Sequence, residues 1–400
     1  MRIDHIEARE VVDTRGRATI ETTILANTLS ASASVPSGKS TGSHEALELR
    51  DEGGGVAQAI ENVNGEIAKA LVGQRLESLD ELDALLIALD GTPNKSRLGA
   101  NALLSVSIAA QRLSAMLTDV PLWSAIAKRA STTPAAPRLF VNMMNGGAHA
   151  DFKLPFQEYI VVVEGKTSEA FPIAQEIFAK LGEKLGDVPM GDEGGYAPTF
   201  DTIEKPFEIL SSLVVGYPNA AVAIDAAASE LFRDGMYHLQ GKSCPPDELA
   251  NVYQGLTSLF QIHSIEDPFA EGAPEDFIKL TATLGDHVLI IGDDFTVTDP
   301  VRIREAAEHK AINAVLIKPN QIGTVRETIE AVQATYAAGF KVVASHRSGE
   351  TADTFIADFA YGVGAHGLKA GAFGQRERLV KYERLLAIEQ EAASANASAS

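Results

Sequence analysis

The last two-thirds of the chain alternates between short apolar runs and longer amphipathic segments. From Leu139 onward, the runs LFVNMMN, EYIVVVE, AVAID, VLIIGDD, AVLIK and KVVASH have the length and composition of buried strands. Helical spacing of apolar residues is found between them, in residues 167–186, 202–215, 245–260, 274–285, 299–310, 324–339 and 351–364. Because strands that alternate with helices of this length form parallel sheets, the pattern predicts an α/β fold with a (β/α) barrel.

Six residues able to carry out chemistry stand at the ends of such apolar runs. They are Asp225, Glu266, Asp293, Lys318, His346 and Lys369. Successive members are 23 to 41 residues apart, the length of a strand plus a returning helix. The active site of a (β/α) barrel lies at the carboxyl ends of its strands, so we expect these six side chains to converge.

The first third of the chain has the pattern of an α+β domain. Two β-prone runs flank a turn at Asp13–Gly16, and a third run covers residues 31–36, which predicts an antiparallel meander. Helical periodicity follows in residues 55–73, 77–91 and 98–117. A chain of 400 residues also favours two domains over one.

Local composition supplies the expected boundaries. Residues 129–138 are rich in Pro, Ala and Thr and are interpreted as a linker, which gives an N-terminal domain at 1–128 and a barrel at 139–391. Residues 392–400 are of low complexity and are predicted to be disordered. Within the barrel, Asp234–Gly235 predicts a small hairpin.

The net charge of −20 narrows the choice of partners. It argues against nucleic acid or an anionic membrane, because both require a basic face. An anionic substrate could bind only where cations are concentrated locally, as bound metal or as clustered Lys and Arg. Because Cys244 is the single cysteine, an internal disulfide is excluded. No histidine motif surrounds it, so we interpret it as a surface thiol without a catalytic role.

The apolar segments argue against membrane insertion. No stretch approaches the roughly 20 apolar residues of a membrane span. The first residues, MRIDHIEARE, lack the apolar core of a signal peptide, so a cytoplasmic location is expected.

The three acidic strand-end residues suggest a metal site. One Asp or Glu after an apolar run is most often a helix N-cap or a solvated turn, and both Asp293–Asp294 and Asp267 could be such caps. Carboxylates that converge from separate strands repel one another unless a cation neutralises them, and oxygen ligands favour Mg²⁺. Glu230 competes with Asp225 for this role; Asp225 is preferred because it ends the apolar run directly.

Lys318 and Lys369 are expected on neighbouring strands. Two ammonium groups close together, beside a metal, would each lower the pKa of the other, so that one lysine could accept a proton. The segment SHRSGET adds His346, Arg347 and Ser348, which could form either a phosphate clamp or a charged turn.

Glycine-rich loops hold further candidates. In GDEGG, residues 191–195, three glycines surround Asp192 and Glu193, which suits a carboxylate held where backbone approaches a ligand closely. Gln157 and Glu158 precede a strand, and His149 stands in NGGAHAD. A lone loop histidine is usually inert, so His149 is a candidate only in combination with the other candidate residues.

The segment PSGKSTG, which contains Ser40, resembles a phosphate-binding P-loop only superficially. That motif requires Gly where Ala33 stands, and no buried parallel strand precedes it. We reject an ATPase function and interpret the segment as a mobile loop that could close over a site.

Taken together, these segments resemble the enolase family over nearly the whole chain. The matching motifs include VPSGKSTGSHEALELRD, DGTPNKSRLGANALLSVS, NGGAHAD, FQEYIVV, GDEGGYAP, SIEDPF, GDDFTVT, IKPNQIGT and SHRSGETADTFIAD. The resemblance implies an enolase-type β/α barrel with a β-β-α-α start and an N-terminal α+β capping domain. It also implies Mg²⁺-dependent, reversible dehydration of 2-phosphoglycerate to phosphoenolpyruvate, with two Mg²⁺ per site, in a homodimer or higher homo-oligomer.

The resemblance also implies a role for each site residue. Lys318 would be the base and Glu193 the acid, with Glu158 beside it and His346 within the catalytic group. Asp225, Glu266 and Asp293 would hold the first metal, and Ser40 would contribute to the second. The implied substrate-binding residues are His149, Gln157, Arg347, Ser348 and Lys369.

The chain departs from the family pattern at Lys39, Phe152, Ala370 and Gln375. None of these removes a group that performs chemistry. Two alternatives stay open: a dehydratase of the same superfamily with another acid substrate, and a non-catalytic binding protein on the same fold.

Overall fold

The computed structural model describes residues 1–39 and 41–399, and the side chains only as far as residue 395. The chain begins with a sheet in which β1 (His5–Val12), β2 (Ala18–Ala26) and β3 (Leu29–Ser34) are antiparallel neighbours. The Asp13 side chain accepts the backbone N–H of Arg15 at 2.8 Å and closes the first turn. The predicted meander is therefore confirmed.

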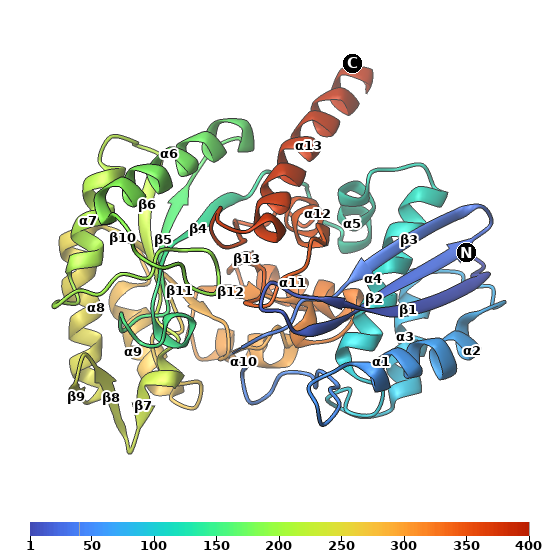
Figure 1. Ribbon diagram of the computed structural model, residues 1–400, viewed down its shortest axis with the longest axis horizontal. Helices are drawn as coiled ribbons and strands as arrows, with labels where there is room; N and C mark the ends of the chain where they lie inside the picture. Colours follow the sequence, from blue (N-terminus) through green and yellow to red (C-terminus); the bar gives the residue numbers. More distant parts are fainter. Residues whose placement is uncertain (40, 400) are drawn as a thin grey trace.

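Helices cover this sheet on one side (Figure 1). The principal one, α4 (Ala100–Leu117), packs on β2 and β3 and is buried along most of its length, because its residues are small or apolar. The segment predicted as one helix at 55–73 consists of α1 (Ala57–Asn62), a π-helical turn η1 (Val63–Ile67) and α2 (Ala68–Leu71). Two further helices of this domain are α3 (Leu79–Asp90), which was predicted, and α5 (Leu122–Ala130), which was not.

Eight strands form a closed barrel. They are β4 (Arg138–Asn145), β5 (Glu158–Val163), β6 (Ala220–Asp225), β10 (Ile262–Glu266), β11 (Leu289–Gly292), β12 (Ala314–Ile317), β13 (Lys341–Ser345) and β14 (Gly367–Lys369). Strand β5 is antiparallel to both β4 and β6, and every other pairing is parallel. Because α6 (Thr167–Leu185) and α7 (Lys205–Val214) both follow β5, the barrel starts β-β-α-α, as the resemblance implied.

The remaining barrel helices lie outside the strands (Figure 1). They are α8 (Pro246–Phe260), α9 (Pro274–Leu284), α10 (Pro300–Glu308), α11 (Val325–Ala337), α12 (Phe355–Gly362) and α13 (Arg376–Ala399). Short 3-10 turns at η2 (Gly147–Ala150), η3 (Ala228–Leu231) and η4 (Pro319–Gln321) follow strands on the site side. The predicted hairpin is present as β7 (Phe232–Arg233) and β8 (Met236–Leu239), joined by a third strand, β9 (Lys242–Cys244).

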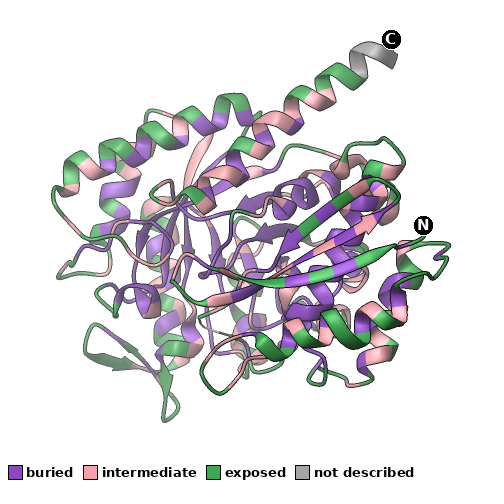
Figure 2. Ribbon diagram, turned by 45° about the vertical axis from the view of Figure 1, so that its right-hand side comes forward, coloured by how far each residue is buried: buried purple, intermediate pink, exposed green. Residues whose placement is uncertain are grey.

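The barrel interior is a packed core, not a channel. Figure 2 shows buried residues concentrated in the barrel strands and on the inner sides of the helices. Side chains from several strands, among them Phe140, Val162 and Leu316, fill the inside. The cavity at the carboxyl ends of the parallel strands is lined mainly by polar side chains.

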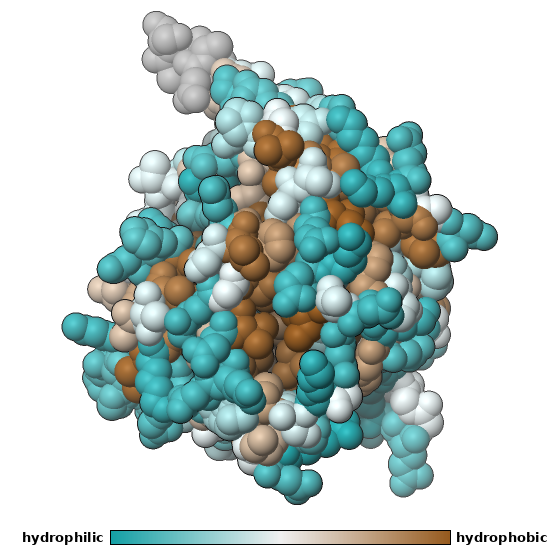
Figure 3. All heavy atoms as spheres, turned by 90° about the vertical axis from the view of Figure 1, so that its left-hand side faces the viewer, coloured by the Kyte–Doolittle hydropathy of each residue, from teal (hydrophilic) through white to brown (hydrophobic). Residues whose placement is uncertain are grey.

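One face of the molecule is mainly polar. On the face shown in Figure 3, hydrophilic side chains predominate and hydrophobic ones are seen mostly in a furrow down its middle. None of the helices in the described part of the chain is both long and apolar enough to cross a membrane. Cys244 lies at the end of β9, where burial raises the pKa of its thiol, whereas a nucleophilic cysteine has a lowered pKa.

The N-terminal domain lies against the barrel mouth. The backbones of Ser37 and Gly349 exchange two hydrogen bonds, each 2.8 Å long. Arg112 of α4 makes a two-pronged ion pair with Asp353, at 2.6 and 2.7 Å. These contacts hold the first domain over the loop that follows β13.

The domain boundaries stay a proposal. We place them in the segment between α5 and β4, which falls within the predicted linker at 129–138. At the other end, α13 continues as helix to Ala399, where residues 392–400 were predicted to be disordered, and Ser400 lies outside the described residues. The Ala-rich composition of this stretch accounts for the helix, because alanine has the highest helix propensity.

Candidate active site

The structure brings the six strand-end residues to one mouth. Asp225, Glu266 and Lys369 are the last residues of β6, β10 and β14. Asp293, Lys318 and His346 follow β11, β12 and β13 directly. Lys318 is half-buried and the other five are buried. The expected convergence is confirmed.

The reversed strand β5 adds two more groups to the mouth. Because β5 runs against its neighbours, its first residue, not its last, lies at the carboxyl ends of the other strands. Glu158 is accordingly paired with Asp225, and Gln157 precedes it. The cavity at the mouth is lined by His149, Gln157, Glu158, Glu193, Asp225, Lys318, Ser345, His346, Arg347, Ser348 and Lys369.

Lys369 is the cation around which the carboxylates gather. Its Nζ donates to Asp225 Oδ2 at 2.9 Å and to both oxygens of Glu266 at 2.9 Å, and it lies 3.0 Å from Glu158 Oε1. Burial alone would lower the pKa of this ammonium, but the three carboxylates outweigh it and raise the pKa well above its usual value. Lys369 is therefore charged.

Lys318 is paired with Asp293, whose other oxygen accepts Gln321 Nε2 at 2.9 Å. Burial opposes the charge, but Asp293 raises the pKa of Lys318 above its usual value. The expectation that the two lysines lie on neighbouring strands is wrong, because strand β13 separates β12 from β14. Each ammonium group is ion-paired with a carboxylate, Lys318 with Asp293 and Lys369 with Asp225. A lowered lysine pKa beside a bound metal stays a prediction.

Among the described residues, the mouth holds more carboxyl groups than its two lysines can neutralise. Burial, and next the charge of Asp225, raise the pKa of Glu266 well above its usual value. Burial and Asp293 raise the pKa of Asp294 to about 8. Excess charge on oxygen-only ligands fits a hard divalent cation such as Mg²⁺. The residues present therefore fit a metal ion.

Of the three predicted carboxylate ligands, which all lie in the described part of the chain, only Asp293 belongs to a group of residues close enough to share a metal ion. Among the described residues, ligand atoms within 4.8 Å of one another occur in the groups His149–Glu158–Glu193 and Asp267–Asp293–Asp294. Lys369 holds Asp225 and Glu266, whereas Lys318 holds Asp293, so the two lysines divide the predicted trio. Asp267 has the ordinary role of a capping residue, since its oxygens accept the backbone N–H groups of Asp293 and Asp294 at 2.8 and 2.7 Å.

Glu230, the alternative to Asp225, does not belong to the site. It lies in η3, five residues beyond the end of β6, and is exposed. The preference for Asp225 agrees with this placement.

The GDEGG loop fixes Glu193 against β4. A Cβ on Gly191 would come within 2.4 Å of the Asn145 side chain, and Gly194 has φ +77°. Asn142 Nδ2 donates to Glu193 Oε2 at 2.9 Å. Gly191 and Gly195 are thus required by the close approach of the two asparagines of β4, which the sequence did not reveal, and Gly194 by its positive φ.

Glu158 and Glu193 are a coupled pair with opposite shifts. Burial and the charge of Glu193 raise the pKa of Glu158 well above its usual value. Burial alone would also raise the pKa of Glu193, but His149, His346 and Arg378 hold it well below its usual value. The two carboxyl groups therefore titrate as one coupled pair, in which Glu158 is the partner that favours the proton.

Burial and the negative charge of Glu193 act in opposite directions on the two histidines of the site. Burial lowers the pKa of His149 and of His346. His149 Nδ1 lies 3.6 Å from Glu193 Oε1, and His346 Nε2 lies 3.8 Å from Glu193 Oε2. Gln157 Nε2 donates to Asp225 Oδ2 at 3.4 Å.

Arg347 faces the N-terminal domain. Its guanidinium donates to both oxygens of Glu45, at 2.9 and 3.1 Å, and to Asn320 Oδ1 at 3.1 Å. Ser348 Oγ is buried and has no hydrogen-bond partner among the described residues. Glu45 stands more than 300 residues away along the chain, so no sequence pattern could have paired it with Arg347.

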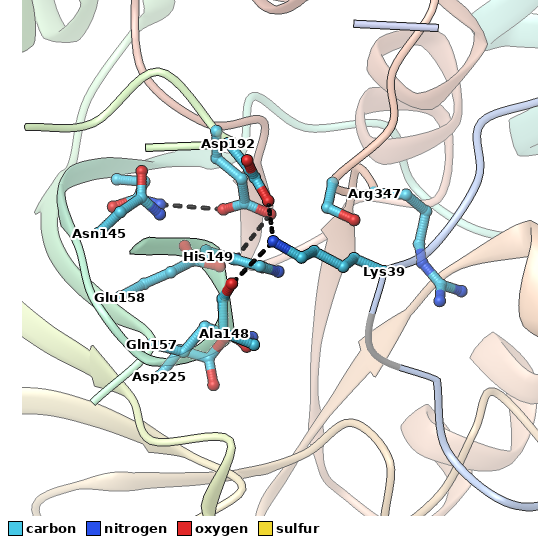
Figure 4. Close-up of polar contacts among 12 residues, drawn as sticks. Lys39, Asn145, Ala148, His149, Gln157, Glu158, Asp192, Asp225 and Arg347 are labelled. Carbon is cyan, nitrogen blue, oxygen red and sulfur yellow. Dashed lines mark hydrogen bonds and ion pairs between the residues drawn. The ribbon is translucent and has the colours of Figure 1, made fainter. Parts of the chain in front are cut away.

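Lys39 joins three loops around the site. Its Nζ donates to Asp192 Oδ2 at 2.7 Å and to the Ala148 carbonyl at 2.8 Å. Figure 4 shows the ammonium between these two groups, beside His149. Its neighbour Ser40, the predicted ligand of a second metal, lies outside the described residues.

Comparisons with known proteins agree with this architecture. Residues 3–126 match the family model for the enolase N-terminal domain, and residues 134–399 match that for the enolase C-terminal TIM barrel domain. The chain is 43% identical to the curated enolase of Methanocaldococcus jannaschii over 406 residues, which covers 97% of this chain and 95% of that protein. The chain therefore belongs to the enolase family, the phosphopyruvate hydratases, which are carbon–oxygen lyases.

Proposed function

We propose that the protein catalyses the Mg²⁺-dependent, reversible dehydration of 2-phosphoglycerate to phosphoenolpyruvate in glycolysis and gluconeogenesis. One observation carries the proposal. A single mouth holds a lysine, a coupled pair of glutamates, and a separate group of carboxylates in excess of their cations. These are the base, the acid and the metal ligands that this reaction requires.

The difficult step is removal of the proton at C2. A proton next to a carboxylate is very weakly acidic, and its loss places a second negative charge on that carboxylate. Bound Mg²⁺, for which we propose Asp225, Glu266 and Asp293 as ligands and Ser40 for a second ion, would stabilise this charge. Lys369, which is buried and positively charged, adds to that stabilisation.

We assign the base to Lys318. An ammonium cannot accept a proton, and Asp293 keeps Lys318 charged in the present state. If Asp293 is engaged by another cation, burial and the nearby Arg347 both favour the neutral amine. Nζ can then take the C2 proton.

We assign the acid to the Glu158–Glu193 pair. Loss of hydroxide from C3 requires a proton, and in this buried pair Glu158 is the partner that favours the proton. Glu193 delivers it to the leaving group, and Glu158 is its source within the pair.

The remaining groups suit an anionic substrate. Arg347 and Ser348 would bind the phosphate, which requires Arg347 to exchange its contact with Glu45 for one with the substrate. His149, Gln157 and Lys369 would line the rest of the site. Arg347 and Lys369 supply the local positive charge that an anionic substrate would need on a protein with a net charge of −20. A homodimer or higher homo-oligomer and a cytoplasmic location stay predictions.

The purified protein tests this proposal in an ultraviolet assay for phosphoenolpyruvate. We expect absorbance to rise when 2-phosphoglycerate and Mg²⁺ are both present, to stop on addition of EDTA, and to resume when Mg²⁺ is restored. No product at ample Mg²⁺ would contradict the proposal. Turnover of another hydroxy acid in its place would indicate a different dehydratase of the superfamily, and turnover of neither would favour a binding protein.

Lys39→Ala is expected to change the Mg²⁺ dependence of the reaction. The variant loses the contacts to Asp192 and Ala148, which hold the loop before Ser40 in place. Because the pair is partly exposed, its own contribution is modest, and we expect a several-fold shift in the Mg²⁺ concentration for half-maximal rate. Lys153→Ala, at an exposed lysine of the neighbouring loop, is the matched control. Superimposable Mg²⁺ titrations of Lys39→Ala and the native protein would show that Lys39 is incidental.

A further inference from the structure

Arg378 is an unassigned buried cation behind the site. It lies in the first turn of α13 and its exposed fraction is 0%. One edge of its guanidinium contacts His346 Nδ1 and the Arg347 carbonyl, the latter at 3.2 Å. The other edge donates to the carbonyls of Asp192 at 3.0 Å and Ser348 at 2.9 Å.

The contact with His346 has only one possible polarity. A guanidinium has five N–H donors, no acceptor, and keeps its charge at all ordinary pH values. Nδ1 of His346 must therefore accept the hydrogen bond from Arg378. A neutral imidazole carries one proton, so that proton is on Nε2.

The other ring nitrogen faces the cavity. His346 Nε2 has no hydrogen-bond partner among the described residues and lies 3.8 Å from Glu193 Oε2, at a distance too long for a hydrogen bond. His346 lines the cavity together with Glu193 and Lys369. An N–H group is thus held ready beside the space that a substrate would fill.

We propose that Arg378 is a positioning residue that fixes His346 as the Nε2–H tautomer, so that His346 serves the site as a hydrogen-bond donor and not as a proton acceptor. The tautomer follows from the contacts alone. Its use in catalysis rests on the proposed function. The donor would face an oxygen of the substrate or the carboxylate of Glu193.

Gln375 explains why the guanidinium stays in this orientation. Its Oε1 accepts Arg378 Nε at 2.6 Å, and its Nε2 donates to the Asp192 carbonyl at 3.2 Å. The polar edge of Arg378 is therefore directed away from solvent toward the loops of Asp192 and Arg347. The same arrangement ties the loop of the proposed acid to the loop of the proposed phosphate clamp.

Nitrogen NMR of protein labelled at histidine tests the tautomer without reference to activity. The spectrum of His346→Gln identifies the signals of His346. We expect His346 in the native protein to show a protonated Nε2 and an unprotonated Nδ1 across neutral pH. A proton on Nδ1, or on both nitrogens, would overturn the proposal even if the enzyme is fully active.

Variants then test the role of Arg378. In Arg378→Met we expect the single tautomer to be lost and kcat to fall at least tenfold, with a smaller change in KM. Arg378→Lys, which keeps a donor without an acceptor, should retain the tautomer and lose less activity. Arg376→Met, at the exposed neighbouring arginine that pairs with Glu383, is the matched control and should change neither. An unchanged tautomer in Arg378→Met would overturn the positioning role. If that variant does not fold, the native spectrum alone decides the tautomer.

Discussion

Lys318→Ala is expected to lower kcat by at least about a hundredfold, because a positioned general base contributes roughly that much or more. The variant removes the amine that we propose takes the C2 proton, and it leaves Asp293 without its ion-pair partner. The diagnostic measurement is exchange of the C2 proton of 2-phosphoglycerate with solvent deuterium. Exchange should disappear together with turnover.

Lys310→Ala provides the matched control for this experiment. Lys310 is an exposed lysine just beyond α10, so its loss should leave both turnover and exchange unchanged. Exchange that persists in Lys318→Ala while turnover is lost would move the role of base to another group. It would leave Lys318 with a part in a later step.

Asp225→Asn is expected to raise the Mg²⁺ concentration for half-maximal rate by at least about tenfold, since even residues that only support a metal ligand change affinity by roughly 10- to 100-fold. The change removes a charged oxygen from the mouth and weakens the contact with Lys369, now 2.9 Å. Calorimetric titration with Mg²⁺ measures the effect independently of turnover.

Glu230→Gln removes an acid of the same charge from the same stretch of chain. Glu230 is exposed in η3, and its replacement should leave Mg²⁺ binding unchanged. A loss of Mg²⁺ affinity in Glu230→Gln that equals the loss in Asp225→Asn would show that the effect is one of general charge and not of ligation. Unaltered binding in Asp225→Asn would remove Asp225 from the metal site.

The site differs from its sequence-based prediction in the state of its ionisable groups. Lys318 and Glu193 were predicted as base and acid, yet in this structure Asp293 raises the pKa of Lys318 against the effect of burial. A separate cause, burial together with the charge of Glu193, raises the pKa of Glu158, and Lys369 opposes it. In the state described, Lys318 and Lys369 neutralise carboxylates of the mouth. A bound metal would take over part of that neutralisation, so the protonation states of the free and metal-bound forms should differ.

The order of strands and helices could be predicted because each element has its own local sequence pattern. Apolar runs of strand length and helices of regular periodicity alternate from Leu139 to the end of α12, and each element was found close to its expected place. Where local signals were weak, the prediction was incomplete. Helix α5 was not foreseen because it adjoins the segment interpreted as a linker.

Part of the site could likewise be predicted from local sequence. A residue that directly follows a barrel strand must lie at the mouth, and this rule located Asp225, Glu266, Asp293, Lys318, His346 and Lys369. It also separated Asp225 from Glu230. The reversed direction of β5 extends the same rule to Glu158, because its first residue lies where the others end.

The sequence by itself therefore determined which chemical groups reach the mouth of the barrel, and tertiary structure decided how they are paired and charged. Arg347 meets Glu45 from the other domain, Asn142 holds Glu193, and Arg378 orients His346 from the last helix. Such contacts join elements far apart in the chain, and their effect on each pKa depends on burial and on distances of a few ångströms. Periodicity and spacing contain no information on either quantity, which is why the folded structure was needed to supply them.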